Sequence, residues 1–238
     1  MYHFEYVTKA EAAPVKKELI AIINAVQDLL RDHFTFRFDF IGSSARNMIT
    51  QDVKSNIGFD FDVNIEVNYD GEEYTAKELR EMLKAAFDRI VPSYGYSPAE
   101  QSTRVLTIKF KNTAHSKIVH SCDIAIIYYC DDADFYGYYY LKNWKDERKD
   151  CKKEVQYTFE PRALRGNVDE KLETILTYQN GWNAIRDEYL KLKNVNTDGG
   201  KRSFSLYLEA VNNIYNQLPD DDSGYDYYDD DEDDDYWD

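Results

Sequence analysis

The sequence has few cysteines, no CxxC pair and no long apolar run. Its three cysteines, Cys122, Cys130 and Cys151, are odd in number, which indicates a reduced, intracellular protein rather than a disulfide framework. No apolar segment approaches the roughly 20 residues that cross a bilayer, and residues 1–9 show no signal-peptide pattern. We therefore expect a cytoplasmic protein without a membrane partner, and the sequence offers no motif for haem, flavin or zinc.

Basic residues are absent from the C-terminal segment 219–238, which contains eleven Asp and one Glu. Without these acids, residues 1–218 hold 33 acidic and 29 basic residues, so the net charge changes from −16 to −4. A nearly balanced body argues against broad electrostatic capture of nucleic acid, but it leaves room for a local basic cleft. We expect a disordered, solubilising tail. Its Tyr and Trp residues leave open a tail that imitates nucleic acid or docks on a protein partner.

Hydrophobic periodicity predicts a mixed α/β (α+β) protein with helices at both ends. Three-to-four spacing and capping residues predict helices over 10–33, 44–53, 75–90, 167–193 and 203–218. Alternation predicts strands over 34–41, 59–67, 104–110 and 117–129, and a hairpin over 136–144 and 154–159. We expect a core over residues 1–160, a helical C-terminal part over 161–218 and the tail over 219–238.

Two carboxylates, Asp60 and Asp62, lie one residue apart on the predicted strand 59–67. Side chains at i and i+2 project from the same face, less than about 7 Å apart, so their like charges repel unless a cation lies between them. Asp123 completes a three-carboxylate site if its strand pairs beside this one. Oxygen ligands of this kind suit Mg²⁺ or Mn²⁺. A solvated face of an edge strand is the alternative interpretation of the Asp60–Asp62 pair.

Gly42 and Ser43 lie where a predicted strand meets a predicted helix. Glycine permits a tight turn and a close approach of the backbone. The Ser43 hydroxyl and the free N–H groups at the start of the helix can hold a phosphate. A strand, a Gly-Ser turn, a short helix and a strand with Asp-x-Asp therefore predict a phosphate-binding turn next to a metal site.

Together these motifs resemble the signature of polymerase-beta-like nucleotidyltransferases. That family carries an apolar residue before Gly-Ser, an apolar-Asp-x-Asp-apolar strand and a later Asp on a neighbouring strand, as in residues 40–44, 59–63 and 122–124. Within the family, the likeness is nearest to oligoadenylate synthetases and bacterial cyclic-oligonucleotide synthases. The step of 18 residues from Gly42 to Asp60 looks longer than the usual spacing, which indicates an insert over 51–58 above the nucleotide.

The resemblance implies a fold and a reaction. The fold is a nucleotidyltransferase core with a mixed sheet, a long N-terminal helix and a helical C-terminal part that walls the cleft. The reaction moves a nucleoside monophosphate from a nucleoside triphosphate to a hydroxyl and releases pyrophosphate. Asp60 and Asp62 would bind two metal ions, Asp123 would bind the catalytic ion and help deprotonate the acceptor, and Ser43 would hold the terminal phosphates. The acceptor stays open between a nucleotide, RNA, a small molecule and a protein.

Other side chains allow two interpretations each. Arg46 and Lys117, with Lys54 and Lys109, are candidates to bind the triphosphate, and a solvent-exposed charge is the alternative for each. We expect the tyrosines of 136–140 to pack in the hairpin, with base stacking as the alternative.

The histidines His115 and His120 lack the spacing of metal ligands, so we expect them to be exposed or structural. A second functional hypothesis keeps the nucleotidyltransferase fold without catalysis. In that case the protein captures a partner through the cleft or the acidic tail.

Overall fold

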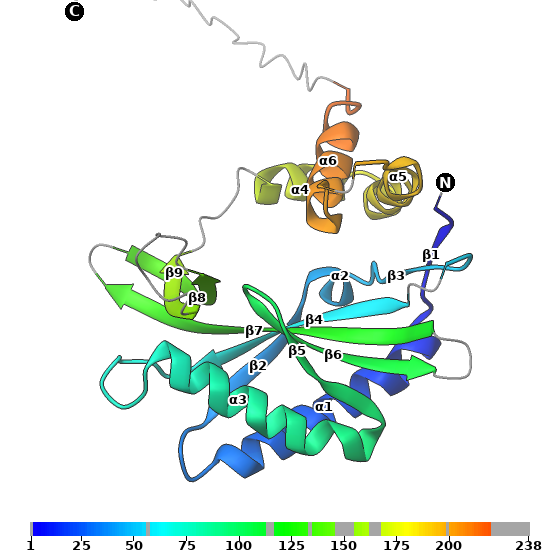
Figure 1. Ribbon diagram of the computed structural model, residues 1–238. Helices are drawn as coiled ribbons and strands as arrows, with labels where there is room; N and C mark the ends of the chain where they lie inside the picture. The colour runs from blue at the N-terminus through cyan, green and yellow to red at the C-terminus, as the bar shows by residue number, and fades with distance from the viewer. Residues whose placement is uncertain are drawn as a thin grey trace, which may run out of the picture.

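The computed structural model describes residues 2–55, 58–112, 117–132, 135–145, 155–161, 168–198 and 200–219. A mixed sheet of seven strands lies between two groups of helices (Figure 1). The helices α1 (Lys9–Leu30) and α3 (Ala76–Ile90) cover one face. The helices α4 (Val168–Thr177), α5 (Gly181–Val195) and α6 (Ser203–Tyr215) lie over the opposite face, which we call the open face.

The central sheet has the strand order β2-β4-β7-β6-β5, and β8 and β9 extend it from the far end of β7. Among the described strands of this sheet, only β4 and β7 run parallel, and the other neighbours are antiparallel. A separate ribbon pairs β1 with β3, and the helix α2 follows β2. The strands are β1 (Phe4–Tyr6), β2 (Phe36–Ile41), β3 (Thr50–Asp52), β4 (Phe59–Val67), β5 (Tyr96–Gln101), β6 (Val105–Asn112), β7 (Lys117–Asp132), β8 (Phe135–Lys145) and β9 (Val155–Pro161), with α2 at Gly42–Ala45 and a 3₁₀ turn at Val91–Tyr94.

Alternation along β4 separates the core from the open face. Phe61, Val63 and Ile65 are buried against α1 and α3, whereas Asp60 and Asp62 lie on the other side. The predicted bounds of this strand are confirmed. The helix predicted over 75–90 from its spacing and capping residues is α3, and Thr75 and Glu78 form a capping box at its start.

A second hydrophobic cluster joins the helices α4, α5 and α6 to the N-terminal ribbon. Met48 is buried among the side chains of these helices, together with Ile185 and Tyr207. The Tyr6 hydroxyl donates to the backbone oxygen of Arg186 at 2.6 Å. These contacts hold the C-terminal helices close to the turn that follows β2.

Several predicted elements are wrong at particular residues. The predicted helix over 44–53 is confined to Gly42–Ala45, and Thr50–Asp52 instead forms β3. The predicted helix over 167–193 is two helices, because Asn180 adopts a left-handed conformation (φ 65°). Leu176 follows the three-to-four spacing that predicts an inward side chain in this segment, but it is 51% exposed. The strands β1 and β5 were not predicted.

No helix of the described ranges has the length and apolar character needed to cross a bilayer. Cys122 is a buried free thiol. His115, Cys151, the turn of the predicted hairpin and the tail 220–238 lie outside the described residues.

Candidate active site

Two neighbouring parallel strands bring the three predicted carboxylates to one face of the sheet. In the register of β4 and β7, the Cα atom of Asp62 pairs with that of Asp123, and Asp60 pairs with Ser121. Opposed residues on neighbouring strands share a face, and the strands lie about 4.8 Å apart. The expected strand pairing is therefore present, and all three acids lie on the open face.

Two hydroxyls hold these carboxylates. Thr107 on β6 donates from Oγ1 to Oδ1 of Asp123 at 2.6 Å, and Ser121 donates to Oδ1 of Asp60. Thr107 is also the Cα partner of Asp123 across β6 and β7, so the hydrogen bond follows directly from the register. These hydroxyls orient carboxylate oxygens that would otherwise rotate freely.

Burial and neighbouring carboxylates disfavour the ionised forms of Asp62 and Asp123. Burial, and then the charges of Asp123 and Asp60, raise the pKa of Asp62 to about 6, whereas Arg46 and Lys193 oppose this shift. Burial also raises the pKa of Asp123, against the hydrogen bond from Thr107. A bound cation would remove both penalties, because it favours the ionised form of each carboxylate.

The chemistry of the three donors fits a divalent cation, because all of them are carboxylate oxygens. Within the described residues, no group of three or more His, Cys, Asp or Glu side chains is gathered tightly enough to form a metal cluster. The strands fix the backbones of Asp60, Asp62 and Asp123 side by side, and their side chains would have to turn toward a shared ion.

The predicted Gly-Ser turn packs directly on this site. Gly42 has a φ of 65°, and a Cβ atom at this position would overlap Oδ2 of Asp62 and lie 3.1 Å from its Cγ. Only glycine allows this approach. Ser43 is the next residue and is half-buried, and its carbonyl accepts a hydrogen bond from the N–H of Met48 at 2.8 Å. This hydrogen bond joins the two ends of the segment 43–48 beside the carboxylates.

Among the four predicted triphosphate-binding cations, Arg46 lies near the carboxylates. It follows α2, its guanidinium lies 4.4 Å from the ring centroid of Tyr207, and its charge acts on Asp62. Lys117 starts β7, six residues before Asp123 or about 20 Å along an extended strand. The structure therefore does not bring Lys117 to the carboxylates.

Of the remaining predicted candidates, Lys54 and His120 lie away from the carboxylates. Lys109 lies on the open face, because its Cα atom pairs with that of Ser121, the strand partner of Asp60. Lys54 is exposed beyond β3, and Lys109 acts on the charge of Asp123 although it forms an ion pair with Glu100. His120 is buried on the core side, where its ring stacks on Phe110 with an interplanar angle of 7°. The expectation of a structural histidine is confirmed at this position.

Two basic residues near the carboxylates were not predicted from the sequence. Lys193 in the last turn of α5 donates from Nζ to Oγ1 of Thr50 at 2.6 Å and to Oγ of Ser203 at 3.3 Å. Burial lowers its pKa to about 8, while the charges of Asp60 and Asp62 oppose this shift. Arg202, just before α6, acts on the charge of Asp123. No local motif marks either residue, because only the packing of α5 and α6 brings them here.

Solved structures of other proteins share the fold of this chain. No protein-family model matches the sequence, and no curated protein matches it. The crystal structure of Vibrio cholerae DncV cyclic AMP-GMP synthase, a prokaryotic cGAS homolog, is similar with a TM-score of 0.54 and 17% identity, over 87% of this chain and 53% of that chain. This chain has the nucleotidyltransferase fold. The fold expected from the Gly-Ser and Asp-x-Asp motifs, and its likeness to cyclic-oligonucleotide synthases, are thus confirmed.

Two further DncV structures agree. The 3′-deoxy ATP bound form gives a TM-score of 0.51 and 16% identity, over 92% of this chain and 55% of that chain. The complex with the linear intermediate 5′ pppA(3′,5′)pG gives a TM-score of 0.51 and 15% identity, over 79% of this chain and 47% of that chain. The chain spans about half the length of the DncV structures that it matches.

Proposed function

We propose that this protein is a metal-dependent nucleotidyltransferase that moves a nucleoside monophosphate from a nucleoside triphosphate to a hydroxyl. One observation carries the proposal. Asp123 pairs with Asp62 on the open face of two parallel strands, and Gly42 packs on the same Asp62 so closely that a Cβ atom would overlap it. Carboxylates that could bind a cation therefore lie directly beside a turn that could bind phosphates.

Asp60, Asp62 and Asp123 would hold Mg²⁺ or Mn²⁺, which when bound supplies positive charge against the triphosphate and lowers the pKa of the attacking hydroxyl. The hydroxyl oxygen forms a bond to the α-phosphorus, and the bond from that phosphorus to the bridging oxygen of the β-phosphate breaks. Pyrophosphate leaves with the bonding electron pair. Asp123 helps to remove the hydroxyl proton, and Thr107 keeps its carboxylate in position.

The triphosphate would lie between the Gly42 turn and the ends of α5 and α6. Lys193 and Ser203 already contact each other there at 3.3 Å, and Lys193 is held by Thr50. Their donors, with Arg46 and the Ser43 hydroxyl, would bind the β- and γ-phosphates. A partly buried positive charge stabilises the leaving pyrophosphate more than a solvated charge does.

A nucleotide is the acceptor that we would test before RNA, small molecules or protein. The DncV structures with similar folds hold 3′-deoxy ATP and a linear dinucleotide intermediate, which shows what that protein binds. The proposal for this chain rests on its fold and on the carboxylate geometry, since sequence identity is low.

The test incubates the full chain with Mg²⁺ or Mn²⁺ and each labelled nucleoside triphosphate, then separates small-molecule, RNA and protein products. We expect labelled product and released pyrophosphate only when the metal is present. The Asp60→Ala and Asp62→Ala double variant removes two carboxylates and should abolish the product, whereas Asp32→Asn, an exposed acid beyond α1, serves as the matched control. Activity that survives the double substitution rules the proposal out.

A further inference from the structure

The strand β2 forms one edge of the seven-stranded sheet. In the described part of the chain it pairs only with β4, in an unbroken register from Phe36 opposite Val67 to Ile41 opposite Asp62. The N–H and C=O groups on its outer side therefore have no strand partner among the described residues. Such a row of backbone groups is a template for another strand.

The other edge of the sheet carries features that hinder pairing, and β2 does not. The edge strand β5 contains Pro98, which has no N–H, and its register shifts between Ser97 and Glu100. The terminal strand β9 ends in Pro161. The sequence of β2, Phe-Arg-Phe-Asp-Phe-Ile, has no proline, no glycine and no register shift.

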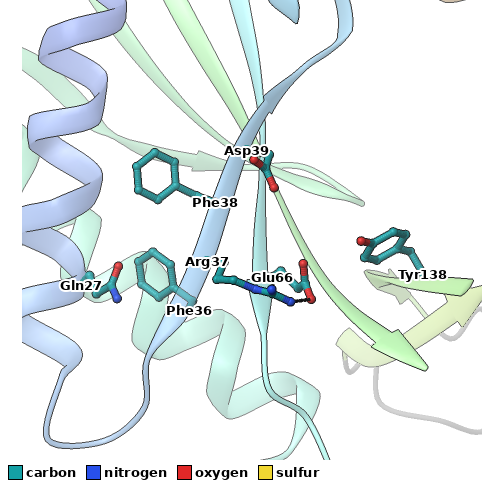
Figure 2. A pocket seen from close by; sticks show the side chains of 7 residues that line it. All are labelled: Gln27, Phe36, Arg37, Phe38, Asp39, Glu66 and Tyr138. Atoms are coloured by element: carbon teal, nitrogen blue, oxygen red, sulfur yellow. Dashed lines mark hydrogen bonds and ion pairs between the residues drawn. The ribbon is translucent and has the colours of Figure 1, made fainter. Parts of the chain in front are cut away.

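The side chains of β2 are sorted onto its two sides (Figure 2). Phe36 and Phe38 point toward α1, whereas Arg37 and Asp39 lie on the open face. The Arg37 side chain is 81% exposed even though its guanidinium binds Glu66 at 2.6 Å. A hollow of about 550 Å³ is lined by Gln27 of α1, by residues 36–39, by Glu66 of β4 and by Tyr138 of β8, so it reaches from β2 onto the open face.

We propose that β2 pairs with β2 of a second copy of this chain, antiparallel about a two-fold axis at Phe38. This register places Arg37 of each copy opposite Asp39 of the other copy. It also places Phe36 opposite Phe40 and the two Phe38 side chains opposite each other. Opposite charges and aromatic pairs directly across an antiparallel ladder stabilise the pairing.

Charge selects this register over its neighbours. An axis at Arg37 would place two arginines opposite each other, and an axis at Asp39 would place two aspartates opposite each other. Like charges in these positions destabilise the ladder. In the chosen register, opposed residues share a face, so the open faces and carboxylates of both copies lie on the same side of one continuous sheet.

The test follows the mass of the full chain by analytical ultracentrifugation, from micromolar to several hundred micromolar, at low salt because salt screens exposed charges. We expect a concentration-dependent dimer of the wild type. Arg37→Asp and Asp39→Arg each create like charges across the axis, so each alone should weaken the dimer at least about tenfold. In an equimolar mixture, one copy presents two acids to two bases of the other, and a heterodimer should form.

Hydrogen exchange on the wild type gives a readout that needs no variant. The amides of residues 36–41 should become more protected as the concentration rises, while those of the opposite edge, 96–101, should not change. A wild type that stays monomeric, a dimer that survives both substitutions, or folded variants that do not associate when mixed would each overturn the proposal. A monomeric wild type would leave this edge to a strand of another protein.

Discussion

Gly42 and Asp62 lie so close together that position 42 has no room for a side chain. A Cβ atom there would overlap Oδ2 of Asp62, and the backbone φ of 65° already disfavours other residues. The turn after β2 and the central carboxylate of β4 are therefore one unit, and a change in either displaces the other.

We predict that Gly42→Ala lowers the rate of nucleotidyl transfer by about a hundredfold or more, because a displacement of about 1 Å at reacting groups has effects of this size. The control is Gly71→Ala, since Gly71 has a similar φ of 80° but a Cβ atom there would meet only Tyr69 at 3.8 Å. The control should lose about 1 kcal/mol of stability and keep its rate. Equal rates in the two variants would contradict the contact between the turn and Asp62.

Lys193→Met should weaken nucleoside triphosphate binding at least about tenfold, because it removes a partly buried positive charge beside the phosphates. Thermal shift with Mg²⁺ and a triphosphate measures the effect, since a ligand stabilises the folded state according to its affinity. The matched control is Lys191→Met on the same helix, whose side chain is 70% exposed and paired with Glu188. A loss of the same size in both variants would assign the effect to the helix and not to the site.

Triphosphate affinity should also fall as the pH rises through about 8. Burial lowers the pKa of Lys193 to about 8, so the side chain loses its positive charge in this range, where an ordinary lysine would keep it. Lys193→Arg keeps a charge at all these pH values, so its affinity should vary less over the same interval. An identical pH dependence in the two proteins would exclude Lys193 as the titrating group.

Thr107→Val should reduce turnover about tenfold with little change in folding, because it removes the hydroxyl that donates to Asp123 at 2.6 Å and keeps the shape of the side chain. Thr107→Ser retains the hydroxyl and should keep most of the activity. Steady-state rates of both variants give the comparison, and a Val variant as active as the Ser variant would show that this hydrogen bond is dispensable.

Arg80 stabilises the fold and has no part in the proposed chemistry. It is fully buried, and its guanidinium donates to the backbone oxygens of Ser102, Arg104 and Val105 at 2.9, 3.3 and 2.8 Å. Arg80→Met leaves these oxygens without their donor and should lower the free energy of unfolding by about 3 kcal/mol or more. Lys77→Met, an exposed change on the same helix, should have little effect in the same denaturant experiment.

The sequence predicted the structure correctly where the candidate site lies within one regular strand. Alternation over 59–67 predicted β4 with its bounds, and it placed Asp60 and Asp62 on one face of the strand. It failed after Gly42, where Thr50–Asp52 pairs with residues 4–6. That pairing joins segments nearly fifty residues apart, and no local periodicity reports it.

The same limit applies to the positive side of the site. Lys193 lies in an ordinary helical turn, and its role depends on how α5 packs against Thr50. Lys117, a predicted triphosphate-binding residue, lies at the start of β7, six residues before Asp123. The local sequence shows which charged residues share a strand or a helix. The packing of the helices determines which of them lie close to the carboxylates.

Met48 lies six residues after Gly42, yet its side chain belongs to the hydrophobic cluster of α4, α5 and α6. Its N–H also closes the turn on the Ser43 carbonyl at 2.8 Å. A tilt of the C-terminal helices would therefore displace Met48, and with it the Gly42–Ser43 turn. The position of α4, α5 and α6 would then be coupled to phosphate binding at the turn. A smaller side chain at position 48 would weaken both the packing of these helices and the turn.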